Sequence, residues 1–101
     1  AVNNADEIFS VKGAEACFLG PFDLSVSMGF KGKQDSPRFQ QAVDKVLAAA
    51  KRHNVVPGMW NGAGLPVAKR LAEGWQLIAV GLDLTLLLDG TRAALERAGA
   101  D

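Results

Sequence analysis

Asp23 is the residue whose position most suggests chemistry, within the stretch FLGPFDLS of residues 18–25. An apolar run ends at Gly20, Pro21 restricts the backbone, and the carboxylate follows shortly after. Carboxylate oxygens are suitable ligands for hard divalent cations. Backbone N–H groups after such a stiff turn can point at an anion. A metal ion beside these amides would suit a 2-oxo acid, whose keto oxygen and carboxylate chelate the metal.

A second interpretation of Asp23 requires no ligand. Its carboxylate caps the next turn of the chain, with Ser25 and Ser27 as further local caps. Spacing alone favours this local role over the ligand role.

Other candidate residues carry weaker signals. Asp83 follows AVGL, and a helix cap or loop brace is favoured there over a ligand role. The amides of NGAG, residues 61–64, fit a phosphate at a helix start, but a plain loop is favoured. Trp60 suits a substrate pocket and core packing equally. His53, the only histidine, is expected at a helix end, where it interacts favourably with the helix dipole and has no catalytic role.

The composition excludes several classes of protein. The chain has 101 residues, 49% hydrophobic and 22% charged, so we expect neither a disordered chain nor a membrane protein. Its 11 basic and 11 acidic residues cancel, which gives no attraction to nucleic acid or to a membrane surface. The single cysteine, Cys17, is interpreted as a buried core residue. The chain shows no signal-peptide pattern, no zinc-type cluster, no nucleophile elbow, no P-loop and no dinucleotide fingerprint, and we expect a cytoplasmic location.

Three short apolar runs are predicted to be the strands that position these residues. They cover Ala16–Gly20, Val55–Trp60 and Leu77–Leu82. None alternates cleanly between apolar and polar residues, which is typical of parallel strands covered by helices.

Helices are predicted between and after these strands. One begins with Ser36 as N-cap and Pro37 as the first helical residue, and it ends near His53 and Asn54. Its apolar face holds Phe39, Val43, Val46, Leu47 and Ala50.

Two further helices and a helical opening segment complete the prediction. The second helix starts around Gly64–Pro66, points Leu65, Ala68, Leu71 and Ala72 inward, and stops at Gly74. The third begins near Asp89, buries Ala93, Leu95 and Ala98, and ends at Gly99. The opening residues 1–11 form the tail of an earlier helix, with Val2, Ala5, Ile8 and Phe9 on one side.

The alternation of helices and strands predicts an α/β fold. Right-handed crossovers make the strands parallel, and three such strands leave two free sheet edges. A closed barrel of eight βα units requires about 250 residues. We therefore expect residues 1–101 to be a single partial domain, the C-terminal portion of a TIM (β/α)8 barrel with about three βα units and outer helices. Functional groups in such barrels lie at the C-terminal ends of the strands, which here read GPFD, WNGAG and GLD.

The stretch GAEACFLGPFDLSVSMGFKG, residues 13–32, resembles the HpcH/HpaI aldolase/citrate lyase family, and in particular its metal-dependent (class II) pyruvate aldolases of the hydroxy-oxoheptanedioate aldolase type. VVPGMW at residues 55–60 and IAVGLDLTLL at residues 78–87 also resemble family segments, so the resemblance covers essentially the whole chain. The residues that match the family motif are Phe18, Gly20, Pro21, Asp23, Leu24, Ser25, Ser27 and Gly29.

The resemblance implies a substrate site at Gly20, Pro21, Phe22 and Asp23. Asp23 would be one of two carboxylate ligands to Mg²⁺, Mn²⁺ or Co²⁺, and the backbone around Gly20, Phe22 and Asp23 would hold the pyruvate carboxylate. Phe22 stands where many members have alanine. The family's glutamate ligand, its arginine and its histidine–aspartate pair lie N-terminal to the matched region, so no further catalytic residue is expected here; Glu7 and Glu15 lie on other elements.

The activity that the resemblance implies is that of a carbon–carbon lyase. It would cleave or form aldols of 2-oxo acids through a pyruvate enolate, with pyruvate or another 2-oxo acid and an aldehyde as partners, and this chain alone would be incomplete. A homo-oligomer is expected, often a hexamer in the family, with C-terminal helices exchanged between subunits through Thr85–Ala98. Two alternatives stay open: a non-catalytic half-barrel for oligomerisation or binding, and a citrate lyase or malyl-CoA lyase relative acting on acyl-CoA thioesters.

Overall fold

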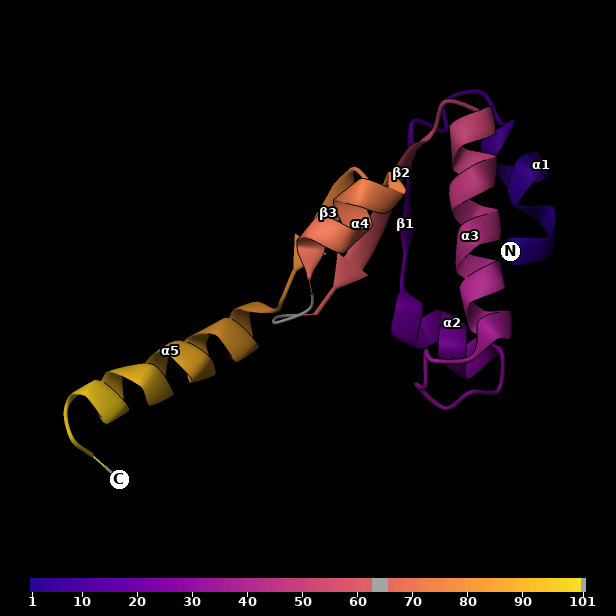
Figure 1. The fold of residues 1–101 in the computed structure, drawn as a ribbon. Coiled ribbons are helices and arrows are strands. Elements are labelled where there is room, and N and C mark those ends of the chain that lie inside the picture. Colours follow the sequence, from indigo (N-terminus) through magenta and orange to yellow (C-terminus); the bar gives the residue numbers. More distant parts are fainter. Residues whose placement is uncertain (63–65, 101) are drawn as a thin grey trace.

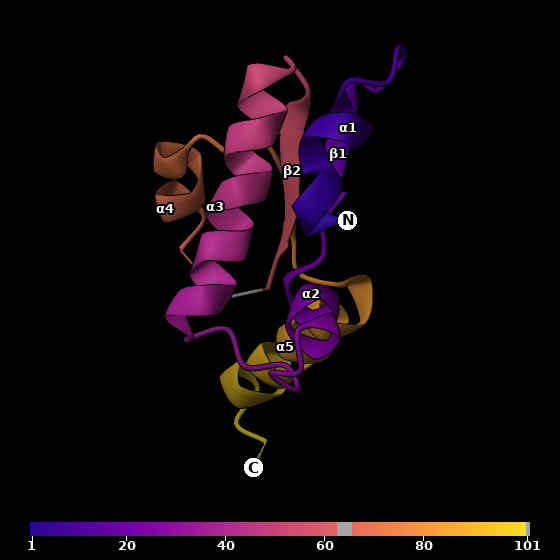
Figure 2. The ribbon, with the colours of Figure 1, turned by 90° about the vertical axis from the view of Figure 1, so that its right-hand side faces the viewer.

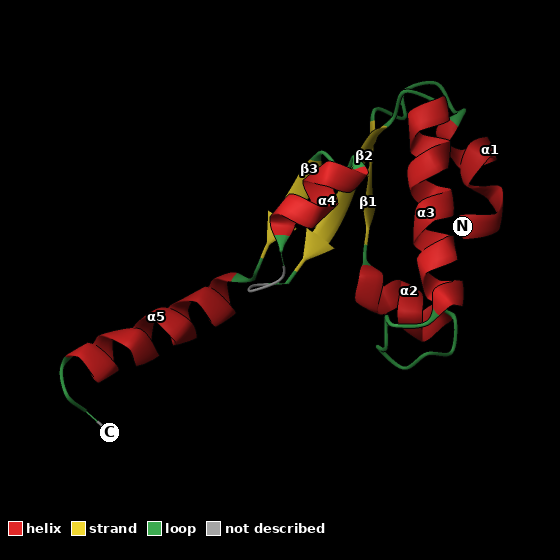
Figure 3. Ribbon diagram, in the orientation of Figure 1, coloured by secondary structure: helices red, strands yellow, loops and turns green. Residues whose placement is uncertain are grey.

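The computed structural model describes residues 1–62 and 66–100, and these form an α/β arrangement (Figure 1). Three parallel strands form one sheet in the order β1-β2-β3, and helices connect them (Figure 3). The elements are the 3-10 helix η1 (Val2–Asn4), α1 (Ala5–Phe9), β1 (Ala16–Leu19), α2 (Pro21–Ser27), α3 (Pro37–Arg52), β2 (Val56–Asn61), α4 (Val67–Glu73), β3 (Leu77–Val80) and α5 (Asp83–Arg97).

The predicted parallel sheet is confirmed, with small shifts at the strand ends. Gly20 lies outside β1 and is the N-cap residue of α2. β3 ends at Val80, before Gly81, whose φ of 73° takes the chain out of the extended conformation.

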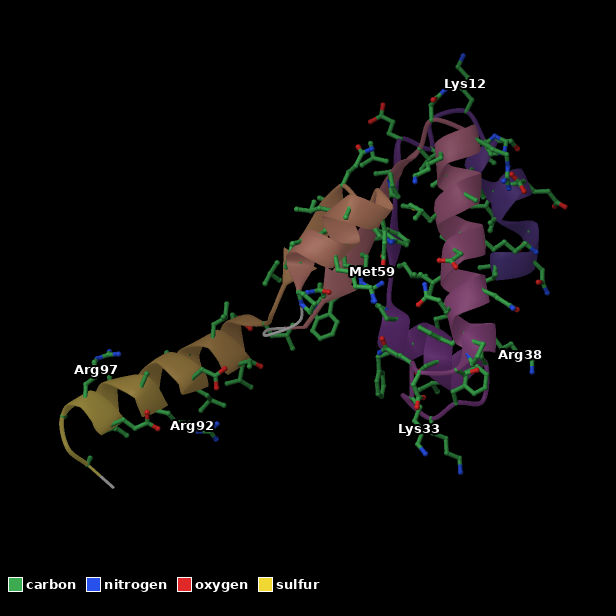
Figure 4. All side chains as sticks on the ribbon, viewed as in Figure 1. Lys12, Lys33, Arg38, Met59, Arg92 and Arg97 are labelled. Atoms are coloured by element: carbon green, nitrogen blue, oxygen red, sulfur yellow. The ribbon has the colours of Figure 1, made fainter. Side chains whose placement is uncertain are left out.

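Helix α3 provides most of the hydrophobic core. Ser36 occupies its N-cap position and Pro37 its first turn, as predicted, although the Ser36 side chain makes no capping hydrogen bond. The buried core cluster consists of Phe39, Val43, Val46, Leu47, Met59 and Trp75. Figure 2 shows α3 between α4 and α1 beside the sheet, and Figure 4 labels Met59 on the strand that α3 covers. This packing holds β2 in the centre of the sheet.

The two faces of the sheet differ sharply in burial. Leu19 and Ile78 pack against the core cluster under α3. Residues of opposite parity point to the other face. There, Phe18 keeps 53% of its surface exposed and Leu77 keeps 50%. The face away from the helices is therefore apolar and open in this chain.

Gly58 allows the closest approach within this sheet. It pairs with Phe18 on one side and with Leu77 on the other. A Cβ built at Gly58 would lie 2.5 Å from the carbonyl oxygen of Cys17 and 3.1 Å from Cδ2 of Phe18. The absence of a side chain at Gly58 is what leaves room for the Phe18 ring over β2.

Two helix predictions are wrong in part. The last helix begins at Asp83 and not near Asp89, because the leucine-rich residues before Asp89 continue the helix through Gly90. Its residues Ala93, Leu95 and Ala98 are not buried, since no element in the described part of the chain covers this helix. In α4, Ala68, Leu71 and Ala72 are exposed, and no residue of that helix is buried. The expected start of α4 and the inward side chain of Leu65 lie outside the described residues.

Helix α5 extends away from the rest of the chain (Figure 1). The radius of gyration is 16.7 Å, against about 13 Å for a compact domain of about 100 residues. Side chains such as Arg92 and Arg97 project into the open space around this helix (Figure 4). Among the described residues, no helix has the length and apolar character needed to cross a bilayer.

An ionic cluster joins the opening helix to the end of α3. Arg52 donates two hydrogen bonds to the carboxylate of Asp6, from Nε at 3.1 Å and from Nη2 at 2.9 Å. His53 Nε2 lies 3.0 Å from Oδ1 of the same carboxylate. The hydrogen bond from Arg52 lowers the pKa of Asp6 below its ordinary value of 3.8. The cluster attaches α1 to the last turn of α3.

Replacing Gly58 with alanine should destabilise the chain, because the added methyl group meets a backbone carbonyl that cannot move without disturbing the β1–β2 pairing. We expect a loss of about 1–3 kcal/mol in the free energy of unfolding, measured by urea denaturation. Gly90→Ala is the matched control, since a Cβ at Gly90 meets open space within a helix. Equal stabilities for Gly58→Ala and the wild type would contradict the close approach.

The stabilising effect of the Asp6 cluster should depend on pH. Because the pKa of Asp6 is lowered in the folded chain, its ionised carboxylate stabilises the fold in full well above pH 3.8, and this contribution is lost as the pH falls below that value. The difference in urea midpoint between the wild type and Asp6→Asn should therefore shrink from pH 6 to acid pH. A difference that stays constant, or that grows in acid, would refute this role. Asp44→Asn is a carboxylate control on the exposed surface of α3.

Candidate functional site

The site lies where β1 ends and α2 begins. Pro21 was expected to make a stiff turn, but it is the first residue of the seven-residue helix α2, a position that suits its fixed φ and its missing N–H. The first backbone hydrogen bond of α2 runs from Leu24 N–H to the Gly20 carbonyl. The N–H groups of Phe22 and Asp23 therefore precede the hydrogen-bonded part of the helix.

Ser25 fixes this first turn of α2 from within. Its side chain is buried, and its hydroxyl donates a hydrogen bond of 2.7 Å to the carbonyl of Phe22. This bond is local but it is not the cap considered for Ser25, because the hydroxyl donates to a carbonyl and α2 has no side-chain capping hydrogen bond. Because Ser25 holds the backbone of Phe22, it also fixes where the neighbouring amides point.

Asp23 presents a free carboxylate at this turn. The residue is exposed, and its side chain has neither a hydrogen bond nor an ion pair with the described residues. A Cβ built at Gly20 would lie 2.8 Å from Oδ2 of Asp23, so the carboxylate rests directly over the glycine. The local capping role considered for Asp23 thus has no hydrogen bond to support it, and the carboxylate remains available to a ligand.

A pocket of about 460 Å³ opens beside this carboxylate. Its volume falls within the usual range of small-molecule sites. It is lined by Phe18, Gly20, Pro21, Phe22, Asp23 and Trp60. All four residues predicted for substrate binding therefore surround one pocket at the carboxyl ends of β1 and β2.

Trp60 lines this pocket. It is not among the buried residues of the core cluster, which was the alternative considered for it. Its Nε1 atom is buried without a hydrogen-bond partner among the described residues. Such an unpaired donor is uncommon in folded proteins. Phe18 is the lining residue that the sequence interpretation missed. It lies two residues before Gly20, and residues two apart along an extended chain point to the same side.

The other candidate residues lie apart from this pocket or are engaged locally. Asp83 is the first residue of α5 and not its N-cap, which is Leu82, and its carboxylate accepts a 2.8 Å hydrogen bond from the N–H of Leu84. His53 ends α3 and contacts Asp6. Cys17 is half-buried and faces the helical layer near Val46. Of the NGAG segment, residues 63 and 64 lie outside the described residues.

The donor set fits one contact to a divalent cation. Asp23 offers an exposed, unpaired carboxylate above a glycine, which is a suitable oxygen ligand. In the described part of the chain, no group of three or more histidine, cysteine, aspartate or glutamate residues comes together. Among the described residues that line the pocket, Asp23 is the carboxylate available to such a cation.

The open pocket at the carboxyl ends of parallel strands is typical of α/β enzymes. The model of the HpcH/HpaI aldolase/citrate lyase family matches residues 1–90. The chain therefore belongs to the HpcH/HpaI aldolase/citrate lyase family, as its motif indicated.

Similar proteins support the same assignment. The 4-hydroxy-2-oxo-heptane-1,7-dioate aldolase of Salmonella paratyphi C is 37% identical over the whole chain. A solved family member from Burkholderia cenocepacia J2315 superposes with a TM-score of 0.90 at 32% identity over 98% of this chain. An HpcH/HpaI aldolase from Desulfitobacterium hafniense gives a TM-score of 0.82 at 31% identity over 97% of this chain. This chain spans 38% of the length of each of these three proteins.

Proposed function

We propose that this chain forms part of a divalent-metal-dependent lyase that cleaves or forms aldols of 2-oxo acids through the enolate of pyruvate. The observation that carries the proposal is the unpaired carboxylate of Asp23, which lies in a pocket beside the first-turn amides of α2. The family and the aldolases that resemble the chain support this reaction class. The proposed substrates are pyruvate or another 2-oxo acid and an aldehyde.

The residues of this chain have distinct tasks in that reaction. Asp23 would be one ligand to Mg²⁺, Mn²⁺ or Co²⁺, which when bound acts as a Lewis acid toward a keto group. The N–H groups of Phe22 and Asp23 point out of the first turn of α2 and are suited to a carboxylate. Gly20 leaves space for the Asp23 side chain, and Trp60 and Phe18 provide apolar walls of the pocket.

The remaining catalytic groups must come from outside residues 1–101. We expect a second carboxylate ligand, an arginine and proton-transfer groups from chain N-terminal to the matched region or from another chain. Residues 1–101 would then form a single partial domain, the C-terminal portion of a (β/α)8 barrel. The exposed apolar face of the sheet at Phe18 and Leu77 is consistent with further strands curving around it.

A homo-oligomer in which α5 packs on a neighbouring subunit is part of the proposal. Leu84, Leu87, Leu88 and Leu95 share one side of α5 and are all exposed. An unpartnered leucine stripe of this kind is typical of a helix that packs on another surface. A non-catalytic module that associates through α5 is the alternative function that the same stripe favours.

Replacing Asp23 with asparagine should weaken Mn²⁺ binding by about tenfold or more, because the substitution removes the charged ligand and keeps the shape. Electron paramagnetic resonance of free Mn²⁺ measures binding, and proton NMR follows metal-dependent deuterium exchange into the methyl group of pyruvate. Gly20→Ala should also weaken binding, since its methyl group displaces the Asp23 carboxylate.

Asp35→Asn is the matched control, because Asp35 is an exposed carboxylate without an ion pair in the described chain. Equal Mn²⁺ binding in Asp23→Asn and the wild type would rule out the metal role. Mn²⁺ binding without methyl exchange would mean that the metal ligand is present but the catalytic groups are not. A chain that forms oligomers but shows neither Mn²⁺ binding nor methyl exchange would favour the non-catalytic alternative.

Charges placed on the leucine stripe of α5 should reduce association. We expect Leu84→Lys combined with Leu87→Lys to give a smaller species than the wild type in sedimentation at equal concentration, because a lysine cannot be buried against an apolar partner without cost. Gly90→Lys adds charge on another side of the same helix, where a side chain meets open space, and should leave the size unchanged. Identical sizes for all variants and for a chain ending at Leu82 would eliminate the exchange of α5.

A further inference from the structure

The ring of Phe22 lies against Gly32, in the loop that follows α2. Phe22 lines the pocket, and 58% of its surface is exposed. A Cβ built at Gly32 would lie 2.8 Å from Cε2 and 3.3 Å from Cδ2 of this ring. The edge of the ring therefore rests on the backbone of Gly32, where any side chain would push it aside.

The loop that carries Gly32 is itself fixed to the end of α2. Phe30 N–H donates a 2.8 Å hydrogen bond to the carbonyl of Ser25, and Lys33 N–H donates a 2.9 Å bond to the carbonyl of Phe30. Gly32 has a φ of 91°, a conformation that L-residues rarely adopt. The Ser25 hydroxyl holds the carbonyl of Phe22 from the other side. Both the backbone and the ring of Phe22 are thus positioned by the same short segment.

Aromatic side chains form most of the pocket wall. Phe18 from β1, Trp60 from β2 and Phe22 from α2 line the same pocket as the carboxylate of Asp23. The other side chain of the lining is that of Pro21, so Asp23 is the only charged group among the described lining residues. Flat rings attract other flat apolar groups through stacked or edge-on contacts. A substituent that carries a carboxylate would find no positive charge on the rings of Phe18, Phe22 and Trp60, and burying its charge against them would be costly.

We infer that Phe22, positioned by Gly32, is a specificity-determining residue that with Trp60 selects an aldehyde bearing a flat apolar substituent over one bearing a carboxylate. The inference rests on the proposed function for the role of the aldehyde, and on the pocket geometry for its chemistry. Phe22 acts by contact with the substituent of the aldehyde, and Gly32 acts only through Phe22.

Binding is measured without turnover through the indole N–H signal of Trp60 in ¹H–¹⁵N NMR spectra. The chain has two tryptophans, and Trp60→Phe identifies the signal of each. Trp75 is 1% exposed in the core, so its unchanged signal reports that a variant is folded. The probes are benzaldehyde, which is flat and apolar, and succinic semialdehyde, which carries a carboxylate. Both are titrated into the full 101-residue chain without added metal.

We expect benzaldehyde to shift the Trp60 signal in a saturable manner and to bind at least about fivefold more tightly than succinic semialdehyde. Phe22→Ala and Gly32→Ala should each weaken benzaldehyde binding about fivefold, with Phe22→Leu between Phe22→Ala and the wild type. Gly29→Ala is the control, because Gly29 has a similar φ of 84° in the same segment but a Cβ there meets open space. It carries the same backbone strain without touching the ring.

Three results would overturn the inference: no Trp60 shift with benzaldehyde, equal or tighter binding of succinic semialdehyde, or equal weakening in Gly29→Ala and Gly32→Ala. Failure of the proposed lyase function is separate, because it is detected by the absence of Asp23-dependent Mn²⁺ binding and methyl exchange. If the chain binds benzaldehyde selectively but lacks Asp23-dependent Mn²⁺ binding and methyl exchange, the inference about the pocket holds and the proposed lyase function does not.

Discussion

The packing of α3 on the central strand is the interaction on which the rest of this structure depends. Val43, Val46 and Leu47 cover Met59, and Trp75 closes the cluster after α4. Because Met59 and Trp60 are neighbours on β2, burying one in the core aims the other at the opposite face of the sheet. The same packing that stabilises the chain therefore brings Trp60 beside the end of β1, where Asp23 and Phe22 begin α2.

Close backbone approaches complete this arrangement. Gly58 lets the Phe18 ring lie over β2, Gly20 lets the Asp23 carboxylate lie over the strand end, and Gly32 supports the Phe22 ring. Each of these three side chains lines the pocket. The shape of the site thus depends on glycines that contribute no functional group of their own, and substituting them would alter the pocket while leaving Phe18, Phe22 and Asp23 in the sequence.

Part of this architecture could be predicted from the sequence because it is local. Apolar runs marked the three strands, and Ser36-Pro37 with its apolar face marked α3. The helix α2 was not expected, since Pro21 suits a tight turn and a first helical turn equally. The start of α5 was placed too late because Asp89 and Gly90 look like a helix boundary. The contact of Gly32 with Phe22 is tertiary, and spacing alone carries no information about it. The sequence pattern also marked leucines on α5 without indicating that they stay exposed among the described residues.

The exposure of α5 couples two processes that are usually treated separately. Isolated helices of about 12–15 residues are only marginally stable in water, and most helical stability in proteins comes from packing of an apolar face. α5 has 15 residues, and none of them is buried within this chain. Its helical content should therefore rise and fall with the occupancy of whatever surface receives its leucines. If α5 packs on a neighbouring subunit as proposed, its helix formation and assembly would form a single concentration-dependent equilibrium, in which dilution unfolds the helix as the subunits separate.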